Sequence, residues 1–172
     1  WFGQIFWGGI SVTFQSTKVF IVNKLHIPMK RDSIIDKNHQ ILYTSTDRAV
    51  IYPSIGEWEM HEKVISNTYQ KGIGKMVFRD EITSIPEKMF MACANLKTIE
   101  IPPSCTVIHD HAFCACLNLE QVVLSEGLRA IHEYAFAKTK LTKIEIPSSC
   151  FIVASYAFDE TPLQEVRLQT PT

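Results

Sequence analysis

A phrase of six residues recurs along the second half of the chain with almost constant spacing. In each copy, a leading apolar residue is followed by further apolar residues three and five positions later, as in Leu96-Lys-Thr-Ile99-Glu-Ile101. The copies begin at Ile73, Leu96, Leu119, Leu141 and Leu163, so their first residues are 23, 23, 22 and 22 positions apart. Self-similarity at this period predicts a solenoid, in which each repeat packs only on its neighbours.

Each repeat carries apolar residues at positions 1, 4, 6, 10, 13 and 18. Alternation at positions 4 and 6 predicts a short strand with one buried face. Pro102 and Pro147 follow two of these strands and mark a corner of the chain, because proline has no N–H to donate within a sheet. The predicted core positions in the three clearest repeats are Leu96, Ile99, Ile101, Cys105, Ile108 and Phe113; Leu119, Val122, Leu124, Leu128, Ile131 and Phe136; and Leu141, Ile144, Ile146, Cys150, Val153 and Phe158.

The second half of each repeat contains a small residue followed by a large aromatic residue, as in Ala112-Phe113 and Ala135-Phe136. This pair predicts a tight turn that inserts one ring into the core. If repeats are spaced by one strand separation, about 4.8 Å, the rings form an offset-stacked ladder. The predicted ladder consists of Tyr69, Phe90, Phe113, Phe136 and Phe158.

The repeat resembles the unit of the BspA-like leucine-rich repeats, which reads roughly L-x-x-I-x-I-P-x-x-V-x-x-I-x-x-x-A-F-x-x-C. The best copy runs from Leu96 to Cys116 and includes Pro102 and Ala112-Phe113. The resemblance covers about residues 73–168. It implies a right-handed α/β-type leucine-rich-repeat solenoid, with a parallel sheet on the concave side and short turns or single-turn helices on the convex side. It also implies surface proteins of bacteria and parasitic protists, often linked to adhesion.

The amino-terminal half interrupts the period. A strand is expected near residues 12–14, with further short strands at 19–22 and 34–35. The β-prone runs 41–43 and 49–52 predict a β-hairpin, and the resemblance favours the same interpretation because members commonly carry an inserted hairpin with Leu-Tyr and Tyr-Pro in its strands. We therefore expect the end of a preceding repeat at 1–14, inserted strands at 15–56, a degenerate repeat at 57–72, and four full repeats plus a truncated one at 73–172.

The five cysteines mostly follow the repeat. Cys105 and Cys150 share a column with Leu128, whereas Cys93 and Cys116 share one with Thr139 and Thr161. Free cysteine is a common core residue, so burial is the expected role for these four. A Cys93–Cys116 bridge between neighbouring repeats in an oxidising compartment is the alternative.

His109-Asp110-His111, with His132 one repeat later, suggests a zinc or copper site. No fourth ligand follows, since Ala154 occupies the next repeat, and zinc sites need four ligands. An exposed polar turn is therefore the favoured interpretation, and neither a metal nor a cofactor is expected.

Composition and motifs exclude several function classes. The chain has 17 basic and 18 acidic residues and a net charge of −1, so it lacks the field that attracts nucleic acid or an acidic membrane. The opening stretch is too short and broken to cross a bilayer. Neither a G-x-S-x-G elbow, a phosphate-binding loop nor an H-E-x-x-H motif occurs. We therefore expect no enzyme activity, no nucleic-acid partner and no membrane insertion in this part of the chain.

The residues between the apolar positions are where binding would occur. Positions 2, 3 and 5 of each strand should point away from the core, and opposite charges on neighbouring repeats are expected to pair, as in Lys97–Glu120, Lys143–Glu165 and Glu145–Arg167. A self-neutralising solvated sheet and a protein-binding surface explain this pattern equally well. The candidate ligand-binding residues are Lys75, Val77, Lys97, Thr98, Glu100, Glu120, Gln121, Val123, Thr142, Lys143, Glu145, Glu165 and Arg167.

The sequence favours a non-enzymatic module that binds another protein, such as a host, matrix or cell-surface protein. A surface or secreted adhesion and recognition role is the first hypothesis. An intracellular, cytoplasmic scaffold or adaptor is the alternative, and an enzyme whose catalytic domain lies outside this sequence is a third class.

Overall fold

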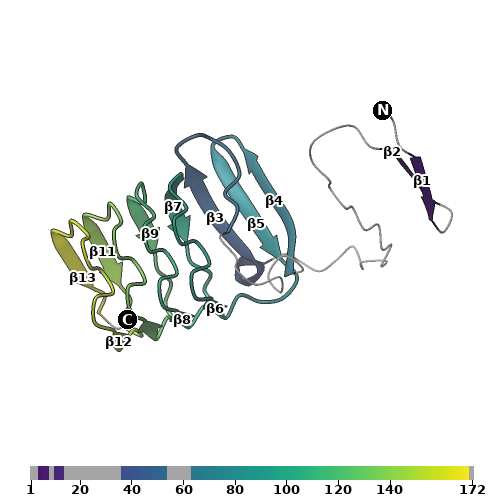
Figure 1. Ribbon diagram of the computed structural model, residues 1–172. Helices are drawn as coiled ribbons and strands as arrows, with labels where there is room; N and C mark the ends of the chain where they lie inside the picture. Colours follow the sequence, from purple (N-terminus) through teal and green to yellow (C-terminus); the bar gives the residue numbers. More distant parts are fainter. Residues whose placement is uncertain (1–3, 8–9, 14–35, 54–62, 171–172) are drawn as a thin grey trace. The chain divides into compact units, whose positions relative to one another are not determined.

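The computed structural model describes residues 4–7, 10–13, 36–53 and 63–170, which form two separate units (Figure 1). The first unit, Trp1–Ser33, contains β1 (Gln4–Trp7) and β2 (Ile10–Thr13), which pair antiparallel. The strand expected at 12–14 thus corresponds to β2, two residues earlier. The strands expected at 19–22 and 34–35 lie outside the described residues.

The second unit, Ile34–Thr172, contains the repeats as rungs of a solenoid (Figure 1). The long strand of each repeat contributes to one face, which we call the main sheet. Neighbouring strands of the main sheet follow the order β4-β5-β3-β7-β9, and β11 and β13 continue it as a separate pair. These strands are β3 (Gln40–Ser45), β4 (Val64–Gln70), β5 (Ile73–Phe78), β7 (Leu96–Glu100), β9 (Gln121–Val123), β11 (Lys143–Ile146) and β13 (Glu165–Leu168).

A second parallel sheet runs along the solenoid, built from two-residue strands around position 13 of each repeat. Its order is β12-β10-β8-β6. The strands are β6 (Ser84–Ile85), β8 (Val107–Ile108), β10 (Ala130–Ile131) and β12 (Ile152–Val153). The sequence pattern predicted buried residues here but not this sheet, because two residues per repeat are too few to show an alternation.

Turns connect this small sheet to the next long strand. Non-glycine residues with φ between 51° and 59° recur at positions 16 and 20, such as His111 and Ala115. Left-handed backbone costs about 1–2 kcal/mol in such residues. The turns offset part of this cost with bonds between rungs: the Phe113 N–H donates to the Ala135 carbonyl (2.8 Å), and the Phe136 N–H donates to the Ala157 carbonyl (2.8 Å). The prediction of short turns is confirmed, and the described part of these repeats contains no single-turn helix.

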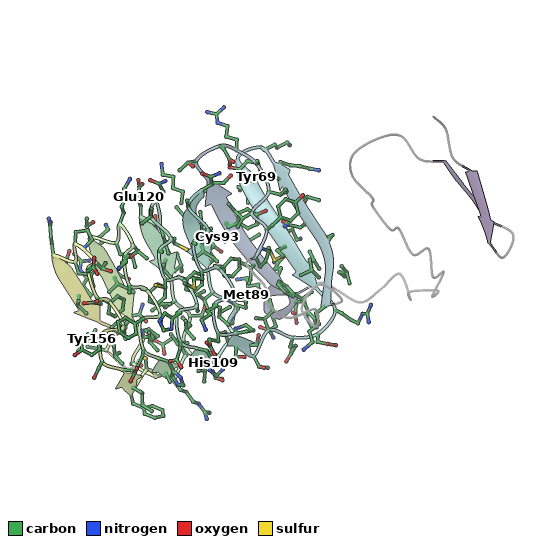
Figure 2. All side chains as sticks on the ribbon, viewed as in Figure 1. Tyr69, Met89, Cys93, His109, Glu120 and Tyr156 are labelled. Carbon is green, nitrogen blue, oxygen red and sulfur yellow. The ribbon has the colours of Figure 1, made fainter. Side chains whose placement is uncertain are left out.

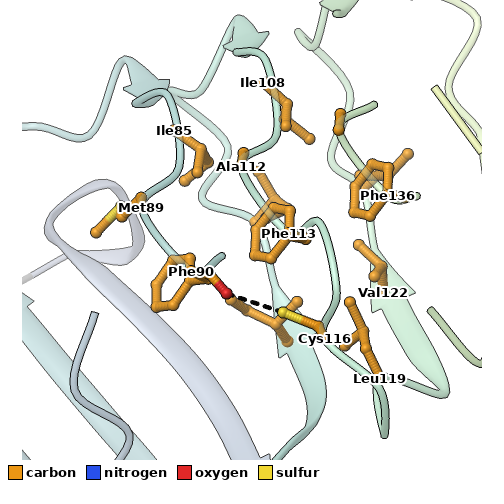
Figure 3. Packing of buried hydrophobic residues seen from close by; sticks show 14 of the residues in the cluster. Ile85, Met89, Phe90, Ile108, Ala112, Phe113, Cys116, Leu119, Val122 and Phe136 are labelled. Atoms are coloured by element: carbon orange, nitrogen blue, oxygen red, sulfur yellow. Dashed lines mark hydrogen bonds between the residues drawn. The ribbon is translucent and has the colours of Figure 1, made fainter. Parts of the chain in front are cut away.

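The core lies between the two sheets and the turns, and the phenylalanines stack through it (Figure 3). Ring centroids are 5.2 Å apart for Phe90 and Phe113, 5.1 Å for Phe113 and Phe136, and 5.5 Å for Phe136 and Phe158, with interplanar angles of 2–6°. The ladder prediction is confirmed for these four rings. Tyr69 is the exception, because it lies on β4 and contacts Tyr43 at 6.2 Å instead.

A second ring ladder occupies position 16, where the sequence pattern predicted no stacking. His111 stacks on Tyr134 with centroids 5.1 Å apart, and Tyr134 stacks on Tyr156 at 5.3 Å. The recurrence of His, Tyr and Tyr at one position was a visible signal of this ladder.

Apolar positions in the outermost rungs are not all buried. Ile73 is 53% exposed, Val153 45%, Val166 52% and Leu168 75%. The sequence pattern assigned these residues to the core. A rung of a solenoid is covered by its two neighbours. Val153, Val166 and Leu168 retain exposed surface because β12 and β13 are the last strands of their sheets.

The inserted segment forms one strand of the expected hairpin. η1 (Lys37–His39) leads into β3, but residues 50–53 form no strand. β3 pairs antiparallel with β5 on one side and β7 on the other, placing Leu42 opposite Glu100 and Tyr43 opposite Gly74. The hairpin is therefore not observed. Instead, β3 lies between β5 and β7, although it precedes both of these repeat strands in the sequence.

The first repeat strands also differ from the expected order. β4 and β5 form an antiparallel hairpin around the turn at Lys71 and Gly72. The described part of the expected degenerate repeat is thus a long strand rather than a corner and turn, while residues 57–62 lie outside the described ones.

Candidate functional site

The exposed side of the main sheet carries the candidate binding residues in the order the sequence predicts. Along β7, Ile99 is buried while Glu100 is exposed, because successive side chains of a strand alternate between faces. Leu96 is buried and Lys97 exposed on the other side of a register shift, where Thr98 and Leu96 pair with the adjacent residues Thr44 and Ser45. Thr98 and Lys75 are half-buried. The exposed candidates are Lys97, Glu100, Glu120, Gln121, Val123, Thr142, Lys143, Glu145, Glu165 and Arg167.

Val77 does not belong to this exposed surface. It is only 3% exposed, although the alternation predicted an outward position. β5 lies between β3 and β4, and Val77 is opposite Gln40 on one strand and Ser66 on the other. Val77 is therefore buried at a position that the repeat pattern places in solvent.

Charged side chains of neighbouring rungs meet on this surface, as predicted in two of three cases. Lys97 Nζ lies 3.7 Å from Glu120 Oε2, and Arg167 Nη1 lies 3.6 Å from Glu145 Oε1. Lys143 is opposite Glu165 in the β11–β13 register, but the Arg167 Nε donates to Glu165 Oε1 at 2.6 Å, and Lys143 forms no ion pair with a described residue. Exposed pairs contribute about 0–1 kcal/mol each, so a partner can displace them at low cost.

The inserted strand β3 widens this surface. Thr44 Oγ1 lies 2.9 Å from Thr98 Oγ1 across the β3–β7 pair. Leu42 and Thr44 of the inserted segment therefore lie beside the candidate residues of the repeats. A strand that pairs out of sequence order leaves no periodic signal, so the spacing did not identify these residues.

A groove opens where β3 begins and where β7 and β9 end. It has a volume of about 210 Å³, and it includes two of the candidate residues, Glu100 and Val123. Its lining consists of Lys37, Gln40, Leu42, Glu100, Ile101, Pro102, Pro103, Val123 and Ser125.

The cysteine column contributes hydrogen bonds to the core. The Cys116 thiol donates to the Phe90 carbonyl at 2.9 Å (Figure 3). In a later rung the hydroxyl of Thr161 donates to the Phe136 carbonyl at 2.8 Å. A small donor therefore satisfies the same type of carbonyl in both rungs, which explains why Thr replaces Cys in this column.

Burial agrees with the predicted core role for three of the four column cysteines. Cys93, Cys105 and Cys116 are buried, whereas Cys150 is half-buried, and the thiol of Cys116 is free, so the Cys93–Cys116 bridge is not formed. Burial raises the pKa of the Cys105 thiol to about 11 and raises the pKa of Cys116 further. Raised pKa values oppose the thiolate form that metal binding and nucleophilic chemistry require.

His109 lies away from Glu120, the residue that precedes β9 of the main sheet (Figure 2). His109 and His132 contact edge to face with centroids 5.2 Å apart, and His132 Nδ1 lies 3.8 Å from Asp110 Oδ1. Asp110 also accepts a hydrogen bond from the Glu133 N–H at 3.0 Å. Among the described residues, no group of three or more His, Cys, Asp or Glu has the arrangement of a metal site.

Comparison with known proteins identifies the repeat. The sequence model of the BspA type leucine-rich repeat region matches residues 65–172 with six copies, which is more than half of the chain. The chain belongs to the BspA type leucine-rich repeat family. The parallel strands of the repeats and their stacked rings agree with the solenoid that the family resemblance implied.

Three solved structures are also similar to this BspA type chain. The pneumococcal vaccine antigen PcpA is 31% identical over 43% of this chain and 19% of its own (TM-score 0.41). The leucine-rich repeat protein TpLRR of T. pallidum is 25% identical over 50% of this chain and 52% of its own (TM-score 0.41). A leucine-rich repeat protein from Bacteroides ovatus is 19% identical over 59% and 31% (TM-score 0.40).

The chain spans about half or less of the length of each of these structures. Their TM-scores lie below 0.5, so the family assignment rests on the repeat match. No curated protein matches the sequence. Within the described residues, none of the helices has the length and apolar character needed to cross a membrane.

Proposed function

We propose that this chain is a non-enzymatic module that binds a protein partner through the exposed side of the main sheet. The observation that carries the proposal is a row of outward side chains on β7, β9, β11 and β13, held in register between β7 and β9 and between β11 and β13. The residues beneath them are buried in one contiguous core, so the row is presented on a rigid support. Solenoids commonly bind partners over such extended surfaces.

The chemistry of the row suits a protein rather than a small molecule. It combines both signs of charge with an exposed apolar side chain, Val123, which is 45% exposed. Opposite charges on a partner can replace the weak pairs at Lys97–Glu120 and Glu145–Arg167, and such complementarity determines specificity and association rate.

A crosslinking experiment tests the location of the surface. A photoreactive residue at Gln121, on the main sheet, should capture the partner, whereas one at Glu133, which is exposed in the turns, should not. Glu145→Lys should then weaken the captured protein's affinity roughly ten-fold, since it places a like charge in the contact. Equal affinities of the folded variant and the parent chain would show that the main sheet is not the binding surface.

We further propose a location at the cell surface or outside the cell, with a role in adhesion or recognition. This proposal is supported by the chain's membership of the BspA type family, because the resemblance to that family implies a surface protein. Proteolysis of intact source cells tests this: a surface protein is digested without lysis. Protection until lysis would favour the alternative, an intracellular scaffold or adaptor that uses the same face. Hydrolase activity of the purified chain would overturn the non-enzymatic assignment.

A further inference from the structure

The groove between β3, β7 and β9 has the size and chemistry of a site for one side chain. Its volume is about 210 Å³, below the roughly 300–1,000 Å³ of typical small-molecule pockets. Its lining is mainly apolar, with Leu42, Ile101 and Val123 beside the rings of Pro102 and Pro103. Such a groove accommodates the apolar stem of a long side chain rather than a whole metabolite.

The polar groups of the groove include hydrogen-bond acceptors without partners. Glu100 is exposed, lies between Leu42 and Val123 in the strand register, and forms no ion pair with a described residue. The Gln40 Oε1 is buried and has no hydrogen-bond partner. Pro102 and Pro103 offer no backbone donor. An occupant must therefore bring donors, and a buried acceptor left unsatisfied has a cost that a donor removes.

We infer that the groove binds an arginine side chain from an extended segment of the protein partner. The inference rests on the proposed function and specifies one anchor point within it. The methylene stem lies on Leu42 and Val123, and the guanidinium donates to the exposed Glu100 carboxylate. Arginine fits better than lysine because its planar group has five donors and is less strongly hydrated, and arginine is enriched among the anchors of protein interfaces.

The charge of Lys37, which also lines the groove, indicates a further feature of the partner's sequence. Lys37 forms no ion pair with a described residue. A lone arginine would be repelled by this ammonium, so the segment should carry an acidic residue near the arginine. Charge complementarity therefore favours a mixed sequence, with apolar residues beside the arginine and a carboxylate close to it.

The test uses the 172-residue chain and capped peptides. The probe is acetyl-Glu-Leu-Arg-Leu-Glu-amide, which offers a carboxylate in either direction, and the matched control has neutral citrulline in place of arginine. Titrations followed by amide NMR should show saturable shifts at Leu42, Glu100 and Val123. Binding should be about five-fold weaker for the citrulline peptide and for the Glu100→Gln variant, the loss expected for one exposed charge pair.

Glu133→Gln is the matched control variant, because Glu133 is an exposed glutamate in the turns, outside the groove. It should bind the arginine peptide as the parent does. Equal binding of the two peptides, or the absence of saturable shifts, would overturn the arginine site and leave the proposed function standing. Shifts centred on β11 and β13 would also overturn it, while supporting the main sheet as a binding surface.

Discussion

At the scale of single residues, Phe113 is the largest fully buried side chain of its rung. Its ring is fully buried and stacks at 5.2 Å on Phe90 and at 5.1 Å on Phe136. Phe113→Ala should lower the free energy of unfolding by about 3–5 kcal/mol, because it leaves a cavity and breaks the ladder at its centre. Urea denaturation followed by circular dichroism measures this loss.

Tyr156→Ala is the control for that measurement. Tyr156 also belongs to a ring stack, but it is 61% exposed. Its truncation should cost less than Phe113→Ala, since less apolar area leaves the core. Equal losses for the two variants would contradict the assignment of Phe113 to the central core.

Single residues also show where the sequence pattern stops being sufficient. Alternation correctly separates Ile99, which is buried, from Glu100, which is exposed. The same alternation places Val77 outside, yet it is only 3% exposed. A periodic pattern predicts the face of a strand to which a side chain points; it does not predict what lies over that face.

At the scale of elements, a hydrogen-bonded tyrosine holds the inserted segment to the solenoid. The Tyr43 hydroxyl donates to Asn67 Oδ1 at 2.7 Å and accepts from the Ile51 N–H at 3.1 Å. The Asn67 side-chain amide in turn donates to the Ile51 carbonyl at 2.8 Å. Residues 49–53 are thus attached to β3 and β4 without forming a strand.

Tyr43→Phe should therefore loosen this segment. It leaves the buried Ile51 N–H without its acceptor, and the expected cost is about 1–3 kcal/mol. Hydrogen exchange at the Ile51 amide should become faster, while exchange at Ile108 in the second sheet should change less. The control is Tyr52→Phe, since Tyr52 is 69% exposed. Unchanged exchange at Ile51 in Tyr43→Phe would show that the hydroxyl does not hold the segment.

The pairing of β3 with β5 also requires a glycine at position 74. A Cβ at Gly74 would lie 2.1 Å from Tyr43 Cε2, so only glycine leaves room for the ring across the β3–β5 pair. The sequence shows Gly74 at an outward repeat position but gives no reason for it. The reason is the inserted strand, which pairs across a long stretch of chain.

At the scale of the whole molecule, buried thiols make stability depend on pH in the alkaline range. Burial raises the pKa of Cys105 from 9.0 to about 11. Between these values the unfolded chain loses a proton that the native chain keeps. The free energy of unfolding should therefore fall as the pH rises, by about 1.4 kcal/mol per pH unit for this thiol.

Urea denaturation at pH 8, 9, 10 and 11 measures the slope. Cys105→Ala should be less stable at pH 8, because it removes buried volume, but its stability should fall less steeply above pH 9. Parallel slopes for the parent and the variant would show that the thiol ionises equally well in both states.

The amino-acid sequence alone determined the period, the buried columns, the aromatic ladder and the cysteine column of this protein. These features could be predicted because each rung of a solenoid packs on its neighbours, so residues one period apart in the sequence lie side by side in the structure. The tertiary structure decided the rest: β3 between β5 and β7, the burial of Val77, the second sheet and the groove at Glu100. The sequence does not show these features, because β3 pairs with strands that are not its neighbours in the chain, and because the two-residue strands of the second sheet are too short to show an alternation.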